Sequence, residues 1–191
     1  MITEDRETIE RVLAGDPEAF NVLVRKYSRM AGAIAFGIAG DFSSAEDIVQ
    51  DAFLKAYRSL GALRDREKFR AWLGGIVRSG ALDSLRRRKA APVLPFSQVF
   101  PEGDGGIPGD SEPSGPASED LQIQKETREK VLEAVRELAR EDRLVVTLKH
   151  MEGLSYKEIA ELTRSTVAAV ESRLFRARQE LKRKLDRTLR K

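Results

Sequence analysis

Apolar residues recur at intervals of three and four along most of the chain, which is the spacing of one face of an α-helix. No stretch shows the alternation of polar and apolar residues that is typical of a half-buried strand. The pattern therefore predicts an all-α fold. In the first ninety residues the apolar stripes belong to three expected helices and comprise Phe20, Leu23, Val24 and Tyr27; Ile48, Ala52, Phe53 and Ala56; and Phe69, Trp72, Leu73, Ile76 and Val77.

Local signals mark where several helices should begin. Asp16 stands before a proline, an arrangement typical of an N-cap followed by the first helical residue. Ser43 and Glu46 have the spacing of a capping box, and so do Ser155 and Glu158. We therefore expect helices to start just after residues 16, 43 and 155.

The stretch from 153 to 181, GLSYKEIAELTRSTVAAVESRLFRARQEL, has the pattern of a short helix, a turn at 163–165 and a longer helix that Thr166 can cap. This is the organisation of a helix-turn-helix, whose second helix fits the major groove of DNA. An ordinary helical hairpin with a solvated basic face is the alternative. The residues that the longer helix is expected to bury are Val167, Val170, Leu174, Ala177 and Leu181.

Residues 91–118 interrupt the helical pattern. Six of the chain's seven prolines and five glycines lie there, with four acidic residues and no Lys or Arg. Such a composition cannot hold a helix or bury a core. We interpret the stretch as a flexible acidic linker, with a coil span of about 30 Å and an extended reach of about 90 Å. It divides the chain into two helical domains, 1–90 and 119–191.

Positive charge is concentrated in two places, although the net charge of the 191 residues is only +3. Residues 64–89 hold nine basic and three acidic side chains, and residues 164–191 hold ten basic and three acidic. One basic patch in each domain suggests a polyanion that is contacted twice. The alternative is that Lys and Arg serve only as well-solvated helix formers.

The composition argues against several classes of function. The chain has no cysteine and one histidine, so neither a thiolate nor a conventional histidine metal site is expected. We find no nucleophile–base pair and no glycine-rich phosphate loop, and we therefore expect no enzyme activity and no cofactor. The charged start of the chain is unlike a signal peptide, and no apolar run approaches the roughly 20 residues of a membrane span. The expected compartment is the cytoplasm, without membrane contact by this chain.

Three segments together resemble one known family, the extracytoplasmic-function sigma factors of bacterial RNA polymerase. AEDIVQDAFLKAY (45–57) resembles the region-two segment that docks on the polymerase clamp. FRAWLGGIVRSGALDSLRRR (69–88) resembles the segment that opens DNA and reads the minus-ten element. EGLSYKEIAEL followed by VESRLFRAR resembles region four, which reads the minus-thirty-five element.

The resemblance implies a residue-level interface in each domain. Asp47, Gln50, Asp51, Leu54 and Arg58 are the expected polymerase contacts. Phe69 and Trp72 offer aromatic faces for unstacked bases, but their helical spacing favours core packing instead. The expected DNA contacts are Arg64, Lys68, Arg70, Arg78, Ser79, Arg86, Arg87, Thr166, Ala169, Glu171, Ser172, Arg173 and Arg176.

Several positions in these segments depart from the family pattern. Ser79 stands where members usually have Asn, Ala169 and Glu171 replace a common Thr and Lys, and Arg164 occupies a turn position that is usually glycine. Because a carboxylate repels phosphate, Glu171 suggests an unusual promoter preference. Two consecutive glycines at 74–75 also fall inside a predicted helix, where each costs about 1 kcal/mol relative to alanine.

The resemblance implies a promoter-recognition subunit that binds the clamp and flap regions of core RNA polymerase, directs it to promoter DNA and assists strand opening. It adds an anti-sigma factor as a further candidate partner. The alternative is a free-standing helix-turn-helix regulator whose first domain senses a ligand or mediates dimerisation.

Overall fold

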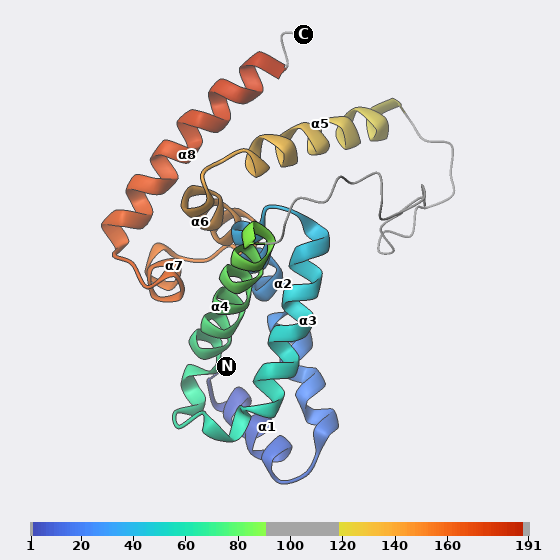
Figure 1. The fold of residues 1–191 in the computed structure, drawn as a ribbon, viewed down its shortest axis with the longest axis vertical. Coiled ribbons are helices and arrows are strands. Elements are labelled where there is room, and N and C mark those ends of the chain that lie inside the picture. The colour runs from blue at the N-terminus through green and yellow to red at the C-terminus, as the bar shows by residue number, and fades with distance from the viewer. Residues whose placement is uncertain (1, 91–118, 189–191) are drawn as a thin grey trace.

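The computed structural model describes residues 2–90 and 119–188, and every regular element within them is a helix (Figure 1). The all-α prediction with two helical parts is confirmed, whereas the predicted linker 91–118 lies outside the described residues. The α-helices of the first part are α1 (Ile2–Leu13), α2 (Phe20–Ala39), α3 (Phe42–Arg58) and α4 (Phe69–Ala90). Short 3-10 turns at Pro17–Ala19, Leu60–Ala62 and Arg66–Lys68 connect them. The second part contains α5 (Glu119–Arg136), α6 (Arg140–His150), α7 (Tyr156–Thr163) and α8 (Val167–Thr188).

Two of the three predicted helix starts are confirmed. The Asp16 carboxylate accepts a hydrogen bond from the backbone N–H of Ala19 at 3.3 Å, at the start of the 3-10 turn that leads into α2. At α7, the Glu158 N–H donates to Ser155 Oγ (3.3 Å), and the Ser155 N–H donates to Glu158 Oε2 (2.8 Å). This reciprocal pair is the capping box expected from the spacing.

The third predicted start, a capping box of Ser43 with Glu46, is wrong. Helix α3 begins at Phe42, and its N-cap is Asp41, whose Oδ1 accepts from the backbone N–H of Ser44 at 2.8 Å. The other oxygen of Asp41 accepts from Arg88 Nη1 at 2.8 Å. This ion pair with α4 holds the carboxylate in place, which explains why Asp41 caps the helix two residues earlier than expected.

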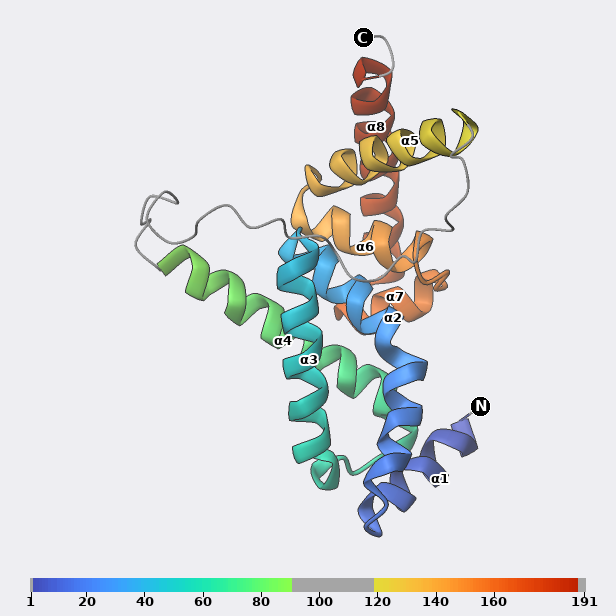
Figure 2. The same cartoon turned by 90° about the vertical axis from the view of Figure 1, so that its right-hand side faces the viewer.

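Helices α2, α3 and α4 pack around one core, and α1 lies at the end remote from α6 (Figures 1 and 2). Leu23, Phe36, Phe69, Leu73 and Val77 are at most 1% exposed. Helix α1 is attached to α2 through the buried Asp5, which accepts hydrogen bonds from the Lys26 ammonium and the Tyr27 hydroxyl. The shared core holds α3 and α4 in a fixed relation to each other, and the Asp5 contacts hold α1 on α2.

The helix-turn-helix is formed by α7 and α8. Arg164 ends α7 in the left-handed conformation (φ 53°), which only glycine adopts without strain. The hydroxyl of Thr166 then accepts from the Ala169 N–H at 3.1 Å and caps α8 as expected. Val170, Leu174 and Ala177 are buried and Leu181 is half-buried, but the prediction for Val167 is wrong. Val167 is the first residue of α8 and is 41% exposed, because it precedes the helical turn that contains Val170 and packs on the core.

The two parts of the chain pack against each other in this structure. Helix α6 lies along the C-terminal half of α2, and α7 lies against α4 (Figures 1 and 2). Buried residues form one continuous apolar cluster that includes Ile34 and Phe36 of α2 and Leu144 and Leu148 of α6. Separating the two parts would therefore expose apolar surface on both helices.

The capping box of α7 should contribute measurably to stability. Ser155→Ala removes the side chain that accepts from Glu158 N–H, and we expect it to lower the free energy of unfolding by about 1 kcal/mol. Chemical denaturation followed by circular dichroism measures the effect. Ser172→Ala, at an exposed position within α8, serves as the control and should change stability by less than about 0.5 kcal/mol. Equal effects of the two substitutions would contradict the role of the cap.

Candidate nucleic-acid and protein interfaces

The five predicted polymerase contacts form an exposed strip along α3. The spacings between Asp47, Gln50, Asp51, Leu54 and Arg58 are three or four residues except for the adjacent pair Gln50 and Asp51, and all five residues are exposed. The Leu54 side chain is 54% exposed, although apolar neighbours on the other face of α3 are buried. Tyr57, three residues later on α3, is also exposed (43%), and exposed apolar side chains surrounded by polar groups are typical of a protein-binding surface.

A polar groove separates this strip from α4. Asp47 and Asp51 of α3 line it on one side, and Asp83 and Arg87 of α4 line it on the other. The structure thus places one of the predicted DNA-binding arginines across a groove from two of the predicted polymerase contacts.

The predicted DNA contacts of the first domain divide into two groups. Arg64, Lys68, Ser79, Arg86 and Arg87 are exposed, two of them in ion pairs with near neighbours: Lys68 with Asp65 and Arg86 with Asp83, both at 3.0 Å. Such exposed pairs are weak, so these cations remain available to phosphate. The second group, described next, is held by the other part of the chain.

Arg70 and Arg78 of α4 are half-buried because both contact α7. Arg70 Nη1 donates to Glu158 Oε1 at 2.6 Å, and Arg78 Nη1 donates to the backbone carbonyl of Thr163. Hydrogen bonds from the Ser155 side chain and backbone, together with the one from Arg70, lower the pKa of Glu158 to about 2. The carboxylate that pairs with Arg70 is therefore ionised throughout the physiological pH range.

The glycine pair inside α4 lies at this same contact. A Cβ at position 74 would stand 2.7 Å from Leu162 Cδ2 of α7, and one at position 75 would stand 3.7 Å from the guanidinium of Arg164. The absence of a side chain at position 74 lets Leu162 of α7 approach α4 closely, whereas a Cβ at position 75 would make an ordinary contact.

The two aromatic residues at the start of α4 are chiefly core residues, as their spacing predicts. Phe69 is fully buried and packs against Tyr27, with ring centroids 5.4 Å apart. Trp72 is half-buried and its ring centroid is 5.9 Å from that of Phe69. Only Trp72 retains surface that an unstacked base can reach.

On α8, most of the predicted DNA contacts face solvent. Thr166, Glu171 and Ser172 are exposed, whereas Ala169 and Arg173 are half-buried. Arg176 is also exposed, but it donates to Asp142 Oδ1 of α6 at 3.0 Å, and this interaction raises the pKa of the guanidinium. Phe175, next to it, is 65% exposed. The exposed surface of α8 thus combines polar and charged groups with two apolar side chains, Phe175 and the Val167 at its start.

Sequence reasoning missed the contact between α2 and α6, which centres on Arg143. This guanidinium is buried, and it donates to the carbonyls of Gly37 (2.9 Å) and Ile38 (3.0 Å) in the last turn of α2. It also donates to the carbonyls of Arg136 and Leu138 before α6. Burial lowers the pKa of Arg143, but carbonyls at a helix C-terminus supply partial negative charge that stabilises the cation.

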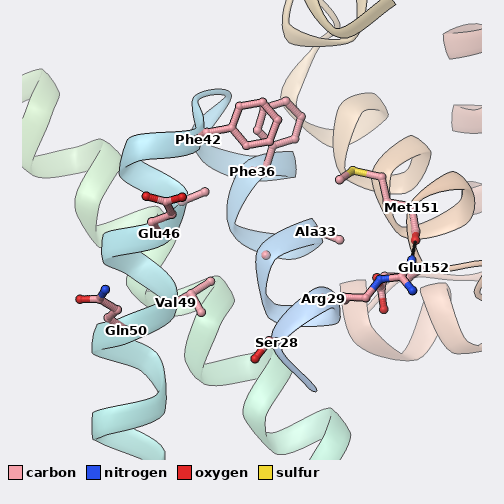
Figure 3. A pocket seen from close by; sticks show the side chains of 12 residues that line it. Ser28, Arg29, Ala33, Phe36, Phe42, Glu46, Val49, Gln50, Met151 and Glu152 are labelled. Atoms are coloured by element: carbon pink, nitrogen blue, oxygen red, sulfur yellow. Dashed lines mark hydrogen bonds and ion pairs between the residues drawn. The ribbon is translucent and has the colours of Figure 1, made fainter. Parts of the chain in front are cut away.

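An apolar groove lies beside this contact, between α2, α3 and the end of α6 (Figure 3). It has a volume of about 590 Å³, and the stacked rings of Phe36 and Phe42 form one end. Arg29 closes the opposite side by donating to the carbonyl of Met151 (2.7 Å) and pairing with Glu152 (3.3 Å). Gln50 of the α3 strip also lines the groove, so the groove adjoins the predicted polymerase contacts.

Within the described residues, no group of three or more potential metal-ligating side chains occurs. No helix in that part of the chain is long and apolar enough to cross a membrane.

Comparison with known proteins matches both parts of the chain to family models. Residues 23–91 match the model of sigma-70 region 2, and residues 128–181 match that of sigma-70 region 4. The RNA polymerase sigma-H factor of Pseudomonas aeruginosa is 34% identical over 98% of this chain and 96% of its own length. The ECF RNA polymerase sigma-E factor of Escherichia coli is 33% identical over 98% of this chain and 97% of its own.

Solved structures with the same fold include two complexes. CnrH, in complex with the cytosolic domain of CnrY, matches with a TM-score of 0.62 and 27% identity, covering 96% of this chain and 97% of CnrH. The sigma factor RpoE from Bartonella quintana, in complex with the anti-sigma factor NepR, matches with a TM-score of 0.61 and 25% identity, covering 87% and 96% of the two chains.

Proposed function

The chain belongs to the sigma-70 family as an extracytoplasmic-function sigma factor, and from this premise we propose which of its residues serve each step of transcription initiation. It binds core RNA polymerase and directs the enzyme to promoters. This function is favoured over the alternative, a free-standing helix-turn-helix regulator. Regions 2 and 4 bind the polymerase and promoter DNA. In this proposal, residues 1–90 recognise and open the minus-ten element, and residues 119–191 recognise the minus-thirty-five element.

We assign polymerase docking to the α3 strip. The observation that carries this assignment is its row of exposed acidic and polar residues around the exposed Leu54. Apolar side chains at the centre of an interface and charged ones at its rim are what stable protein contacts need. Transcription from a promoter library by core polymerase, with and without the chain, tests the function. Omission of the chain should abolish the specific starts.

We assign promoter opening to the basic side chains of α4 and of the turns before it. Arg64, Lys68, Arg86 and Arg87 are exposed and suited to phosphate contacts along separated strands. The loop at 61–65, which resembles the segment with which the family holds a flipped base, contains Arg64 and lies shortly before α4. No covalent chemistry is required by this role, and we infer action in the cytoplasm without a cofactor.

An inhibitory partner is also proposed. Bartonella quintana RpoE is solved with an anti-sigma factor, and CnrH with the cytosolic domain of CnrY. Both cover nearly all of their own length in the match with this chain. We infer that an anti-sigma factor binds this chain as well and competes with core polymerase.

Glu171 should narrow the upstream promoter preference. Because Glu171 is exposed on α8, Glu171→Lys replaces a group that phosphate repels with a phosphate partner. We expect the holoenzyme to bind minus-thirty-five variants more tightly by roughly tenfold, with weaker discrimination among them. Selection from a randomised promoter library measures both effects.

Gln179→Lys is the control, since it introduces the same side chain at another exposed position of α8, two turns further along, with a charge change of one unit instead of two. The control should leave the selected sequences unchanged. If Glu171→Lys also selects the wild-type sequences, residue 171 does not face the promoter.

A further inference from the structure

We propose that Asp142 of α6 is a positioning residue for promoter recognition, which holds the guanidinium of Arg176 on α8 in the orientation that a guanine edge in the major groove requires. The inference rests on the proposed function in one respect, namely that α8 reads the minus-thirty-five element. It goes beyond that function because Asp142 lies outside the predicted DNA contacts and acts only through Arg176.

The first step is that the acceptor of this pair is fixed. Arg176 Nη2 donates to Asp142 Oδ1 at 3.0 Å, and Asp142 is 6% exposed. Helices α6 and α8 pack directly against each other, and the residues beside Arg176 in the sequence, Leu174 and Ala177, are at most 1% exposed. Both partners lie within the second part of the chain, so the pair does not depend on how the two parts meet.

The second step is that the arginine is held and still accessible. The side chain of Arg176 is 64% exposed, whereas that of Asp142 is 9% exposed. A guanidinium carries its N–H donors in one rigid plane, so a bond to one nitrogen restricts the direction of all the others. Asp142 accepts from Nη2, which leaves the donors on Nη1 and Nε for DNA. The pair therefore positions the arginine without burying it.

The third step is that a base edge needs a held arginine, whereas a phosphate does not. Arginine reads guanine through two parallel hydrogen bonds to O6 and N7, which require a defined guanidinium plane. A mobile cation serves a phosphate equally well, and α8 already exposes Arg178 and Lys182 for that role. Ordering the side chain of Arg176 during folding also removes an entropic cost from DNA binding. A buried carboxylate that holds one arginine therefore indicates base readout.

Asp142→Leu tests the proposal, because it removes the acceptor from a buried site that an apolar side chain can fill. Asp142→Asn is the conservative variant, since it keeps an acceptor oxygen of the same shape. Glu141→Leu is the matched control. It makes the same substitution of a carboxylate in the first turn of α6, but Glu141 pairs with its neighbour Arg140 at 3.2 Å.

Holoenzymes that contain each variant select from a promoter library with a randomised minus-thirty-five element, and the bound fragments are sequenced. Asp142→Leu should lower the preference for guanine at one base pair by about tenfold and leave the other positions unchanged. Asp142→Asn should retain most of this preference, and Glu141→Leu should retain all of it. Arg176→Ala should lose the same preference at the same base pair. Adding Asp142→Leu to Arg176→Ala should then cause no further loss.

Asp142→Ala, which occupies less space, should give the same result and serves if circular dichroism shows that Asp142→Leu does not fold. A guanine preference lost in Arg176→Ala but kept in Asp142→Leu and Asp142→Ala overturns the positioning role. A uniform loss of affinity for every sequence in these variants of Asp142, or a uniform gain, overturns it as well. A wild-type holoenzyme that selects no sequence in this element would contradict the proposed function, and this inference with it.

Discussion

Core RNA polymerase should raise the affinity of this chain for a promoter duplex by about a hundredfold or more at physiological salt. The chain alone presents a single recognition helix, α8, whose exposed face carries the acidic Glu171 together with basic side chains. One helix-turn-helix contacts few base edges and depends on phosphate contacts that salt weakens. The polymerase holds both domains on the promoter together, so the second basic cluster adds to the first.

Fluorescence anisotropy with a labelled promoter fragment measures this difference, and a scrambled fragment of equal length is the control. The chain alone should bind the two fragments with nearly equal, weak affinity. With core polymerase, only the promoter fragment should be bound tightly and yield transcripts. Tight, specific binding by a dimer of this chain without polymerase would instead favour a free-standing regulator.

Asp51→Arg should weaken the binding of core polymerase by tenfold or more. Asp51 is exposed at the middle of the α3 strip, next to the exposed Leu54, so a reversed charge would face the partner across a partly desolvated contact. Like charges brought together at an interface cost several kcal/mol. Titration of labelled core polymerase with each variant measures the loss.

Glu7→Arg is the matched control for this substitution, since it makes the same change of charge at an exposed position of α1. Circular dichroism should show wild-type helicity for both variants. Wild-type affinity in Asp51→Arg would exclude α3 as the docking surface. An equal loss of affinity in Glu7→Arg would attribute the effect to net charge instead.

The helices were predictable because their signals are local. The apolar spacing of Leu23, Phe69 and Val77 reflects burial on a neighbouring helix, and all three are fully buried. The capping box of Ser155 and Glu158 depends only on residues three apart. The start of α3 was not predictable in this way, since Asp41 is held by Arg88, which lies 47 residues later in the sequence.

The interfaces were predictable only in part, for a related reason. Exposure of the α3 strip follows from the periodicity of one helix. The partners of Arg70 and Arg78 depend on how two segments, separated by more than 80 residues in the sequence, meet in space. The glycines at 37 and 74 were the available signal, because each is unfavourable within a helix unless another backbone or side chain must approach. Residue spacing alone does not say which segment approaches.

The contacts of Arg70 and Arg78 with α7 should lower the number of copies of this protein that a cell needs. A genome offers millions of non-specific sites, which retain any protein that carries exposed cations in proportion to the phosphates it contacts. In this chain, Arg70 pairs with the carboxylate of Glu158 and Arg78 donates to the backbone carbonyl of Thr163. Two fewer cations are then available to phosphate, so a smaller fraction of the protein is bound to non-specific DNA. More of the population then remains free to bind core RNA polymerase.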